Sequence, residues 1–596
     1  MQPARSGALG SRTERRRIAV AALAAIVLAI GLRAAALDAG WFQDDAVQIA
    51  MLEGAYPGDY AAFDLFRFAD VERDGRAGLD AGSLPWWSAP NLRIAMFRPL
   101  ASGLIALDHV SFGIDARPAH VHSLLWLAAA IGALALALGE LFAAPVVALA
   151  LFFFAADESL SAPAGWIANR SYLIVASFGW LAVWAHVRAQ RTISTGRLRL
   201  VEALCISLAL AGGEYALGML AYPIALELFR RHAPWRDRGI ALVPAIVPGV
   251  VYLALRGALG FGTRGSGFYL DPLATPIAFM HALFERLPTL IGMLVVGNTA
   301  RWGLAADTRA AWVAAGVAAG LALLAAAWWA SRDATGIARP ALLAMAAGAL
   351  GSLVPTASAL PDERLLVSAA GGAASVFACV VIVAGSRARA ALRSRAPLRA
   401  LALAALALGL VFVHGFEAAQ RSHATLAAFA QRARAEWQWA QSAAIPDDPD
   451  AQVVFLSGAD FTTNASLVQV RRLAGHVSPR SYWRLSPYSL PHVVERISDD
   501  AIEVRVLQGT ALPFANSLYR SDATPLASGD VVELDGMRVT VLEAQDGEPL
   551  HLRFAFGRSL DDPRLVFLHA TPRGMRRIAM PPVGGKLRLP PPAQPR

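Results

Sequence analysis

Two adjacent carboxylates, Asp44 and Asp45, follow the first apolar segment of the chain, residues 18–37. Paired aspartates at a bilayer surface suit three tasks: removing a proton from a substrate, binding a cation, or starting a helix. Asp is a favoured residue at a helix N-terminus, so the dipeptide alone favours the helix start. Residues further along the chain change that balance.

Further charged and aromatic side chains recur at the ends of later apolar segments, on what alternation predicts to be one side of a membrane. Charged groups are costly at membrane depth, so those held near helix ends indicate either function or pairing. For each residue taken singly, a solvated or ion-paired helix end is the simpler interpretation. The residues are Arg98, His120, Asp157, Glu158, Trp166, Arg170, Glu214, Arg256, Glu363 and Arg364.

The composition indicates a multi-pass membrane protein that positions these residues. Of the 596 residues, 56% are hydrophobic and 17% are charged, and the mean hydropathy is +0.45. Apolar runs predict about eleven transmembrane helices, whereas the polar residues within 277–296 predict an interfacial or partly inserted helix. The runs are residues 18–37, 120–141, 145–156, 171–187, 200–212, 216–229, 240–255, 310–330, 340–359, 365–384 and 398–413.

Arginine marks the predicted cytoplasmic side. Residues 1–17 form a basic segment ahead of the first apolar run, which indicates a cytoplasmic N-terminus. With eleven spans, the arginine-rich loops all fall on that side and the C-terminus lies outside. These loops are residues 188–199, 230–238, 332–339 and 387–399. We therefore expect a bacterial inner-membrane protein whose opposite loops face the periplasm.

The charge balance does not indicate nucleic-acid binding. The net charge is +9 and the isoelectric point is about 10.0, but the arginines lie between apolar runs and form no single basic stripe. Lys586 is the only lysine, and with the heavy use of alanine this bias is typical of a GC-rich bacterial genome.

A change of composition near residue 445 predicts a second domain. Residues 453–456 form an apolar run typical of a buried strand, and Asp535-Gly536 is a strong hairpin signal. The fold class predicted is thus a membrane all-α protein with a small C-terminal β domain. The predicted C-terminal segments are a helical linker (416–445), a periplasmic β-rich domain (446–583) and a disordered, proline-rich tail (584–596).

Short motifs at the predicted outer ends of the spans carry a family resemblance. In chain order they are Asp44-Asp45, Phe97-Arg98-Pro99-Leu100, Phe112-Gly113, His120, Trp166-Ile167-Ala168-Asn169-Arg170, Gly213-Glu214, Leu255-Arg256 and Glu363-Arg364-Leu365. Their order and spacing resemble the tetratricopeptide-associated transmembrane O-mannosyltransferases and their bacterial relatives, which are polytopic glycosyltransferases of the GT-C class. By this resemblance, residues 18–415 form a GT-C-like transmembrane domain with periplasmic loops.

The chain departs from the family pattern at three places. Where the family often has an acid four residues before Trp166, this chain has Ala162, and Asp157 or Glu158 could take that role. Gly213 stands where a lysine commonly precedes the glutamate of its motif. The C-terminal tetratricopeptide array of the family is absent from this sequence. These departures leave the sugar and the acceptor open.

The resemblance implies an integral membrane glycosyltransferase that moves a hexose from a polyprenyl-phosphate donor to an acceptor hydroxyl on the periplasmic side. Asp44 or Asp45 would be the general base, and the other would orient the acceptor or bind a cation. Charge builds on the leaving phosphate, and the arginines expected to hold it are Arg98, Arg170 and Arg256. Other candidate site residues are His120, Asp157, Glu158, Trp166, Glu214, Glu363 and Arg364.

The implied partners are a membrane, the lipid-linked donor and an acceptor that is a protein, a lipid or a glycan. A divalent cation held by Asp44 and Asp45 could help to neutralise the phosphate, and the sequence does not decide whether one is used.

The alternatives are a transporter or lipid flippase of the cell envelope, and a scaffold that displays the β domain. A transporter typically places charges at mid-membrane and is often built from repeated halves. The centres of the apolar runs are nearly free of charge, and no repeat is evident. A scaffold would give the charged loop residues no purpose. The enzyme is therefore the favoured hypothesis.

Overall fold

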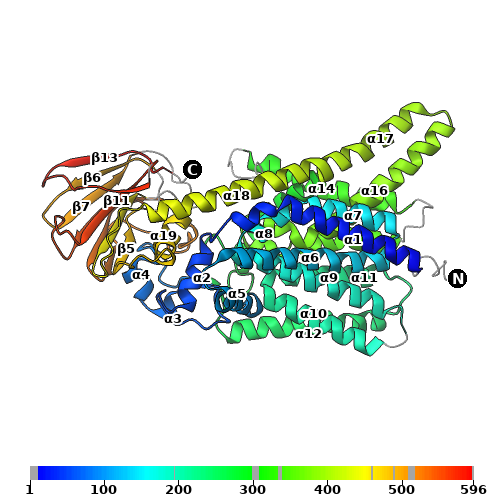
Figure 1. The fold of residues 1–596 in the computed structure, drawn as a ribbon, viewed down its shortest axis with the longest axis horizontal. Coiled ribbons are helices and arrows are strands. Elements are labelled where there is room, and N and C mark those ends of the chain that lie inside the picture. Colours follow the sequence, from blue (N-terminus) through cyan, green and yellow to red (C-terminus); the bar gives the residue numbers. More distant parts are fainter. Residues whose placement is uncertain are drawn as a thin grey trace.

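The structure is a computed structural model of the 596-residue chain. The molecule is elongated, with a helical bundle at one end and the β domain at the other (Figure 1). We call the end of the bundle that faces the β domain its outer end. The structure describes all residues except 1–10, 193–194, 298–307, 333–338, 458–460, 487–489, 508–516, 573 and 594–596. Part of the predicted basic N-terminus and of the loop 332–339 therefore lies outside the described residues.

Every predicted apolar run forms a helix in the bundle. Runs of apolar residues with few Gly or Pro interruptions satisfy their own backbone hydrogen bonds as helices, which membranes require. The helices are α1 (Arg12–Leu32), α6 (Ala116–Leu141), α7 (Ala144–Ala156), α9 (Ser171–Ala189), α10 (Thr195–Gly212), α11 (Ala221–Phe229), α12 (Trp235–Ala258), α14 (Arg309–Ala330), α15 (Arg339–Ser352), α16 (Val367–Arg393) and α17 (Pro397–Val411).

Among the described residues, eight helices are long and apolar enough to cross a membrane, or nine if one bent pair counts as a single span. The eight include α13, which was not among the eleven expected spans. Four expected spans are left out, because α1 begins with arginines, α10 carries charges in its first turns, and α7 and α11 have only 13 and 9 residues. All four nevertheless pack into the bundle. How many helices cross a membrane stays a prediction.

Helix α13 (Pro276–Val296) coincides with residues 277–296, for which the sequence predicts an interfacial or partly inserted helix. It meets the length and apolarity of a span. Yet Arg286 in its middle donates to Ser358 O at the outer end, and Val295 O near its end lies 3.1 Å from His414 Nε2, in the turn before α18. This placement fits a helix lying at the outer end better than one crossing the bundle.

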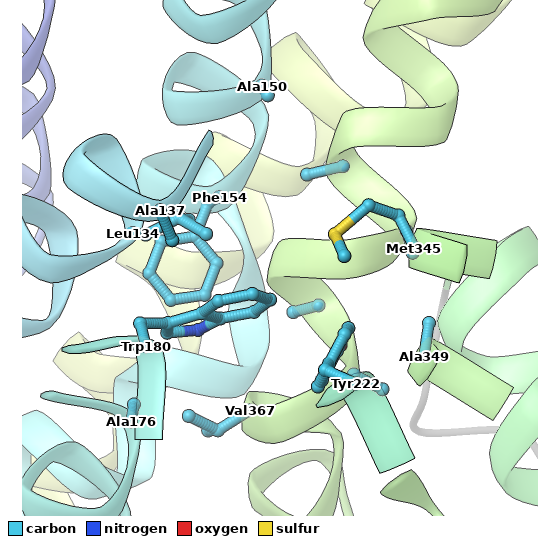
Figure 2. Close-up of a cluster of buried hydrophobic side chains, with 14 of the residues drawn as sticks. Leu134, Ala137, Ala150, Phe154, Ala176, Trp180, Tyr222, Met345, Ala349 and Val367 are labelled. Carbon is cyan, nitrogen blue, oxygen red and sulfur yellow. The ribbon is translucent and has the colours of Figure 1, made fainter. Parts of the chain in front are cut away.

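The centre of the bundle is built around two large aromatic side chains. Trp180 of α9 and Tyr222 of α11 are fully buried, with their rings 4.7 Å apart. Figure 2 shows them among small and branched side chains from neighbouring helices. A Cβ at Gly371 of α16 would lie 2.5 Å from the Trp180 ring, and one at Gly348 of α15 would lie 2.4 Å from the Tyr222 ring. Glycine at these positions lets the helices approach closely enough to pack.

The long segment between α1 and α6 folds into a compact lobe on the outer end. Strand pairing across the lobe involves a distant segment, because β3 (Gly262–Arg264) completes a three-stranded antiparallel sheet with β1 and β2. The lobe elements are α2 (Asp44–Leu52), β1 (Arg67–Asp70), α3 (Val71–Asp74), α4 (Ala77–Ala81), β2 (Arg93–Ala95) and α5 (Pro99–Phe112).

A long helical rod joins the bundle to the β domain. Helix α17 continues through a wide turn at Phe412–Glu417 into α18 (Ala418–Gln441), so that residues 397–441 form one 45-residue helical segment (Figure 1). Its second part is the helical linker expected from the sequence. At about 1.5 Å per residue, 45 residues span on the order of 65 Å.

The β domain consists of two sheets. The predicted strand at 453–456 is β4, and the predicted hairpin forms around Asp535-Gly536 between β8 and β9. One sheet is antiparallel, in the order β13-β6-β7-β10-β9-β8, and the other has the order β12-β11-β4-β5. The strands are β4 (Gln452–Ser457), β5 (Ser481–Arg484), β6 (His492–Arg496), β7 (Ala501–Val506), β8 (Val531–Leu534), β9 (Met537–Gln545), β10 (Glu548–Phe556), β11 (Leu565–Thr571), β12 (Gly574–Arg577) and β13 (Lys586–Leu589).

The C-terminal domain is rich in β structure, as predicted, and it also contains one helix. Strand β4 pairs in parallel with β5 and β11, and helix α19 (Phe461–Leu473) makes the crossover from β4 to β5. The disordered tail predicted at 584–596 is wrong for Lys586–Leu589, because β13 pairs with β6 there. The four residues of this short strand pair one by one with residues 492–495 of β6, although prolines follow the strand. Residues 594–596 lie outside the described part.

Candidate functional site

A cavity of about 550 Å³ lies at the outer end, enclosed by the lobe, the helix ends and the β domain. We call it the outer pocket. Aromatic side chains form much of its wall, and its charged groups come from segments far apart in the sequence. The polar and charged side chains that line it include Asp44, Arg98, Asn169, Tyr172, Glu214, Tyr269, Asp362, Glu363, Arg364 and Arg432.

Asp44 is the first residue of α2 and lines the outer pocket. Burial raises the pKa of its carboxyl to about 6, while Arg364 and Arg98 pull the pKa in the opposite direction. A carboxylate with a pKa near 6 is ionised at neutral pH and is a better base than an ordinary aspartate. Of the two predicted aspartates, Asp44 is the one in the pocket.

Asp45 points away from the pocket and is 1% exposed. Its Oδ1 accepts a hydrogen bond from Ala168 N–H (2.8 Å), and its Oδ2 accepts one from Phe42 N–H (3.1 Å). Burial raises the pKa of Asp45 to about 8, although both backbone donors lower it. The adjacent carboxylates therefore have different surroundings, as expected for neighbours about 100° apart around a helix.

Arg98 and Glu214 form a bidentate ion pair on the pocket wall. Arg98 Nε and Nη2 donate to the two carboxylate oxygens of Glu214, at 3.0 and 2.6 Å. Burial alone would raise the pKa of Glu214, but Arg98 holds it below its ordinary value. The guanidinium also lies over the rings of Phe66 and Tyr215. Arg98 thus lines the pocket, as a phosphate ligand would, but its charge is already paired with Glu214.

Arg364 is the pocket arginine with the weakest hold on a carboxylate. Its Nε lies 3.6 Å from Asp362 Oδ1, and among the described residues its guanidinium makes no hydrogen bond. It stands 5.2 Å from the centre of the Trp166 ring. Because a phosphate group takes up unfilled N–H donors, Arg364 has the best surroundings for binding one.

Trp166 also lines the pocket, as its motif predicted. Its ring meets Phe42 edge to face, with centroids 5.2 Å apart. The indole N–H is buried and has no hydrogen-bond partner in the described part of the chain. Buried polar groups in native proteins are nearly always satisfied, so a bound polar molecule would complete this site.

Arg170 and Arg256 are corrections to the predicted phosphate ligands, because the structure does not bring either to the pocket. Arg170 is 1% exposed and donates to Asp108 (2.5 Å), to Ser123 Oγ (2.9 Å) and to Ala119 O (2.6 Å). These bonds hold the segment after Trp166 against α5 and α6.

Arg256 is engaged in a similar way. Its Nη2 donates to Asp271 Oδ2 at 2.6 Å, so its charge is met by the loop that follows α12. Both arginines close recognisable motifs, yet each is matched to a carboxylate outside the pocket.

Three other sequence candidates lie beside the pocket rather than in it. Asp157 caps the short helix after α7 through Ser159 N–H. Glu158 pairs with Arg421 of α18 at 3.1 Å. His120 is fully buried, with Nε2 2.9 Å from Gly40 O. Glu363 does line the pocket, next to Arg364.

Residues that the motifs did not indicate complete the wall. Arg432 of α18 lines the pocket, pairs with Glu436 (2.9 Å) and lies over the Phe42 ring. Leu518 and Tyr519 reach it from the β domain. Arg432 sits on an amphipathic helix, where sequence alone does not separate a pocket residue from a solvated one, and the β-domain segment becomes a wall only through long-range packing.

The predicted aspartate pair is not arranged to bind a metal ion together. Asp45 is turned to backbone amides, which leaves Asp44 as the only one of the two that faces the pocket. Within the described part of the chain, no group of three or more His, Cys, Asp or Glu side chains is arranged to hold a metal ion.

No family model matches the sequence, and no curated protein matches it. Among solved structures, the fold is similar to the oligosaccharyltransferase AglB from Archaeoglobus fulgidus in complex with an inhibitory peptide and a dolichol-phosphate, with 12% identity, a TM-score of 0.45, and coverage of 79% of this chain and 65% of that one.

A second structure of the Archaeoglobus fulgidus oligosaccharyltransferase, tethered with an acceptor peptide, has 13% identity and a TM-score of 0.43, and covers 80% of this chain and 64% of that one. This chain thus spans slightly less than two thirds of the length of those proteins.

Proposed function

We propose that the protein is a membrane glycosyltransferase that moves a hexose from a polyprenyl-phosphate donor to an acceptor hydroxyl in the outer pocket. The observation that carries the proposal is the presence of Asp44 and Arg364 in one cavity at the outer end of a membrane bundle. A carboxylate with a raised pKa and an arginine without a hydrogen-bonded partner among the described residues are the two groups that this transfer needs.

In the proposed reaction, Asp44 takes the proton of the acceptor hydroxyl as its oxygen forms a bond to the anomeric carbon. The bond from that carbon to the donor phosphate oxygen breaks, and its electron pair stays on the phosphate. Arg364 binds the phosphate through charge-assisted hydrogen bonds that strengthen as negative charge builds up. The products are the glycosylated acceptor and the polyprenyl phosphate.

The remaining pocket residues have positioning roles in this proposal. The indole N–H of Trp166 would donate to a sugar hydroxyl, which would satisfy a buried donor. The Arg98–Glu214 pair forms a rigid, charge-matched wall beside Asp44. The polyprenyl chain would lie along the apolar helices, with its phosphate at their outer ends. We place the acceptor side in the periplasm of a bacterial inner membrane, as the arginine distribution predicts.

The test is turnover of a synthetic polyprenyl-phosphate hexose by the purified protein. The panel would contain mannose and glucose donors, with peptide, lipid and glycan acceptors. We expect release of free polyprenyl phosphate with the wild type and no release with Asp44→Asn, while binding of the donor persists. A lipid flippase would move the intact donor across a vesicle membrane without releasing polyprenyl phosphate, and that result would overturn the proposal.

A further inference from the structure

Gln43, immediately before the proposed base, has a backbone conformation that side chains rarely adopt. Its φ is 43° and its ψ is −105°. Among the described residues, only Gln43, Arg395 and Asp546 combine a side chain with a positive φ. Such conformations cost on the order of 1–3 kcal/mol and persist only where surrounding contacts enforce them. The turn that presents Asp44 is thus strained.

Asp45 supplies the contacts that close this turn. Its Oδ2 accepts from Phe42 N–H at 3.1 Å, and its own N–H donates to Phe42 O at 3.0 Å. The two residues flank Gln43 and Asp44, so the reciprocal bonds clamp the strained residue between them. This arrangement resembles a capping box, in which an acid in the first turn reaches back to a backbone N–H.

The second oxygen of Asp45 connects the turn to another segment of the pocket wall. Oδ1 accepts from Ala168 N–H at 2.8 Å, in the segment that carries Trp166 and Asn169. That segment is itself fixed by Arg170, which is bonded to α5 and α6. A continuous chain of buried hydrogen bonds therefore links the Asp44 turn to the helices of the bundle.

We propose that Asp45 is a positioning residue for the transfer reaction, which holds the strained turn at Gln43 so that Asp44 faces the acceptor in the outer pocket. The inference rests on the proposed function of the outer pocket. It gives Asp45 no contact with the substrate and no proton transfer. Two adjacent acids then have separate tasks, one in the reaction and one in the geometry of the turn.

The test measures kcat and KM of Asp45→Asn and Asp45→Glu in the full-length protein, with a polyprenyl-phosphate hexose as donor. Asn replaces one acceptor oxygen by an N–H₂ group, and Glu moves the carboxyl group by one methylene. We expect kcat per folded molecule to fall about 10- to 100-fold in both, because a buried backbone N–H loses its acceptor. The KM for the donor should change less than about threefold, because the smallest net contribution of a hydrogen bond, about 0.5 kcal/mol, corresponds to a change of about that size.

The pH profile and a rescue variant separate positioning from other roles. Residual transfer by Asp45→Asn should keep the acid limb of the wild type, since Asp44 still acts as the base. Adding Gln43→Gly should restore part of the lost kcat, because glycine adopts a positive φ without strain. Should Asp45→Asn fail to fold, Asp45→Glu and the Gln43→Gly/Asp45→Glu pair are compared in the same way.

Three outcomes would overturn the inference. They are an unchanged kcat in both Asp45 variants, loss of the acid limb in Asp45→Asn, and absence of any rescue by Gln43→Gly. An active Asp44→Asn variant would instead contradict the proposed function, so the two failures are distinguishable.

Discussion

Carboxylate partners distinguish the arginines that the sequence brings to the outer end. Glu214 holds Arg98, Asp108 holds Arg170 and Asp271 holds Arg256, each through hydrogen bonds of 2.5 to 3.0 Å. Arg364 stays 3.6 Å from Asp362. A guanidinium already hydrogen-bonded to a carboxylate gains little from a phosphate, whereas the Arg364 guanidinium, which makes no hydrogen bond to a described residue, gains charge-assisted hydrogen bonds.

Replacement of Arg364 by Lys should therefore impair donor binding more than the same replacement at Arg256. Lysine keeps the charge but loses the planar fork, so Arg364→Lys should weaken binding by about ten- to a hundredfold, equivalent to 1.5–3 kcal/mol. Arg256→Lys is the matched control, because its side chain pairs with Asp271 away from the pocket. Isothermal titration with the donor lipid measures both. Equal affinities for the two variants would contradict the assignment.

The raised pKa of Asp44 predicts the pH dependence of transfer. Burial moves this pKa to about 6, so the carboxyl becomes protonated as the pH falls through that value. A protonated carboxyl cannot accept the acceptor's proton, so kcat should decline below about pH 6 and level off above it. The measurement is the pH profile of kcat at saturating donor. An acid limb near pH 4, the ordinary range of aspartate, would contradict the buried environment of this residue.

The sequence narrowed the pocket acid to the adjacent pair Asp44 and Asp45, and the structure shows that Asp44 is the one that lines the pocket. Asp44 follows a span and starts a helix, and both facts are local. Whether an arginine is free depends on partners such as Asp108 or Asp271, which lie 62 and 15 residues away, respectively. Motif position alone pointed to Arg170 and Arg256, and their recognisable motifs turned out to anchor the walls of the pocket.

Helix α13 does not line the outer pocket but is hydrogen-bonded to the segments that do. Arg286 donates to the carbonyl oxygens of Phe268, Ala357 and Ser358, at 3.4, 3.3 and 3.1 Å. Phe268 and Ser358 both line the pocket. One side chain thus joins a loop, a short helix and α13 around the wall.

Arg286→Ala should loosen this wall. The variant removes the Arg286 hydrogen bonds to these carbonyl groups, each worth about 0.5–1.5 kcal/mol net, so the melting temperature should fall and the KM for the donor should rise. Arg309→Ala is a suitable control, because Arg309 of α14 forms an exposed ion pair with Glu285, the neighbour of Arg286 on α13. Exposed ion pairs contribute about 0–1 kcal/mol. Thermal unfolding in detergent compares the variants. Equal melting temperatures would show that Arg286 does not stabilise the wall.

Elements with strong local signals were predicted, and elements defined by pairing were not. The apolar runs became helices, and Asp535-Gly536 became a hairpin, because both depend on neighbouring residues. Strand β13 pairs with β6, about ninety residues earlier, and β4 pairs in parallel with β11, more than a hundred residues later. Such partners leave no local pattern, so the sequence alone predicts a disordered tail at this position.

At the scale of the whole molecule, the β domain is docked closely onto the lobe. Trp86 Nε1 donates to Leu485 O at 3.1 Å, and Trp483 Nε1 donates to Asp80 O at 3.0 Å. Arg520 donates to the carbonyl oxygens of Trp87 and Ser88, at 2.7 and 3.0 Å. These bonds bring Leu518 and Tyr519 to the pocket.

A chain that ends at Gln441 should lose transfer but keep donor binding. Asp44 and Arg364 remain, whereas the wall formed by Leu518 and Tyr519 is gone. We expect transfer to fall at least tenfold, or about 1.4 kcal/mol in the activation barrier, with donor affinity little changed. The full-length Tyr519→Ala variant serves as the comparison, since it opens the wall without removing the domain. Loss of donor binding in a folded truncation would contradict this division of tasks.

The predicted topology has a separate test. Alkaline phosphatase fused after Arg395, between α16 and α17, should be inactive, because that loop is predicted to be cytoplasmic. The same enzyme fused after Ser442, beyond α18, should be active. An active fusion at Arg395 would contradict the predicted orientation.

The docking of the β domain also has a consequence for biosynthesis. Arg520 meets Trp87 across 433 residues of sequence, so the lobe leaves the ribosome long before its partner is made. At about 5–20 residues per second, roughly 20 to 90 s pass between the two. During that interval the apolar face around Trp86 and Trp87, buried in the finished molecule, is uncovered and open to chaperones. Because one pocket wall comes from near the C-terminus, a chain interrupted during synthesis cannot assemble the complete site.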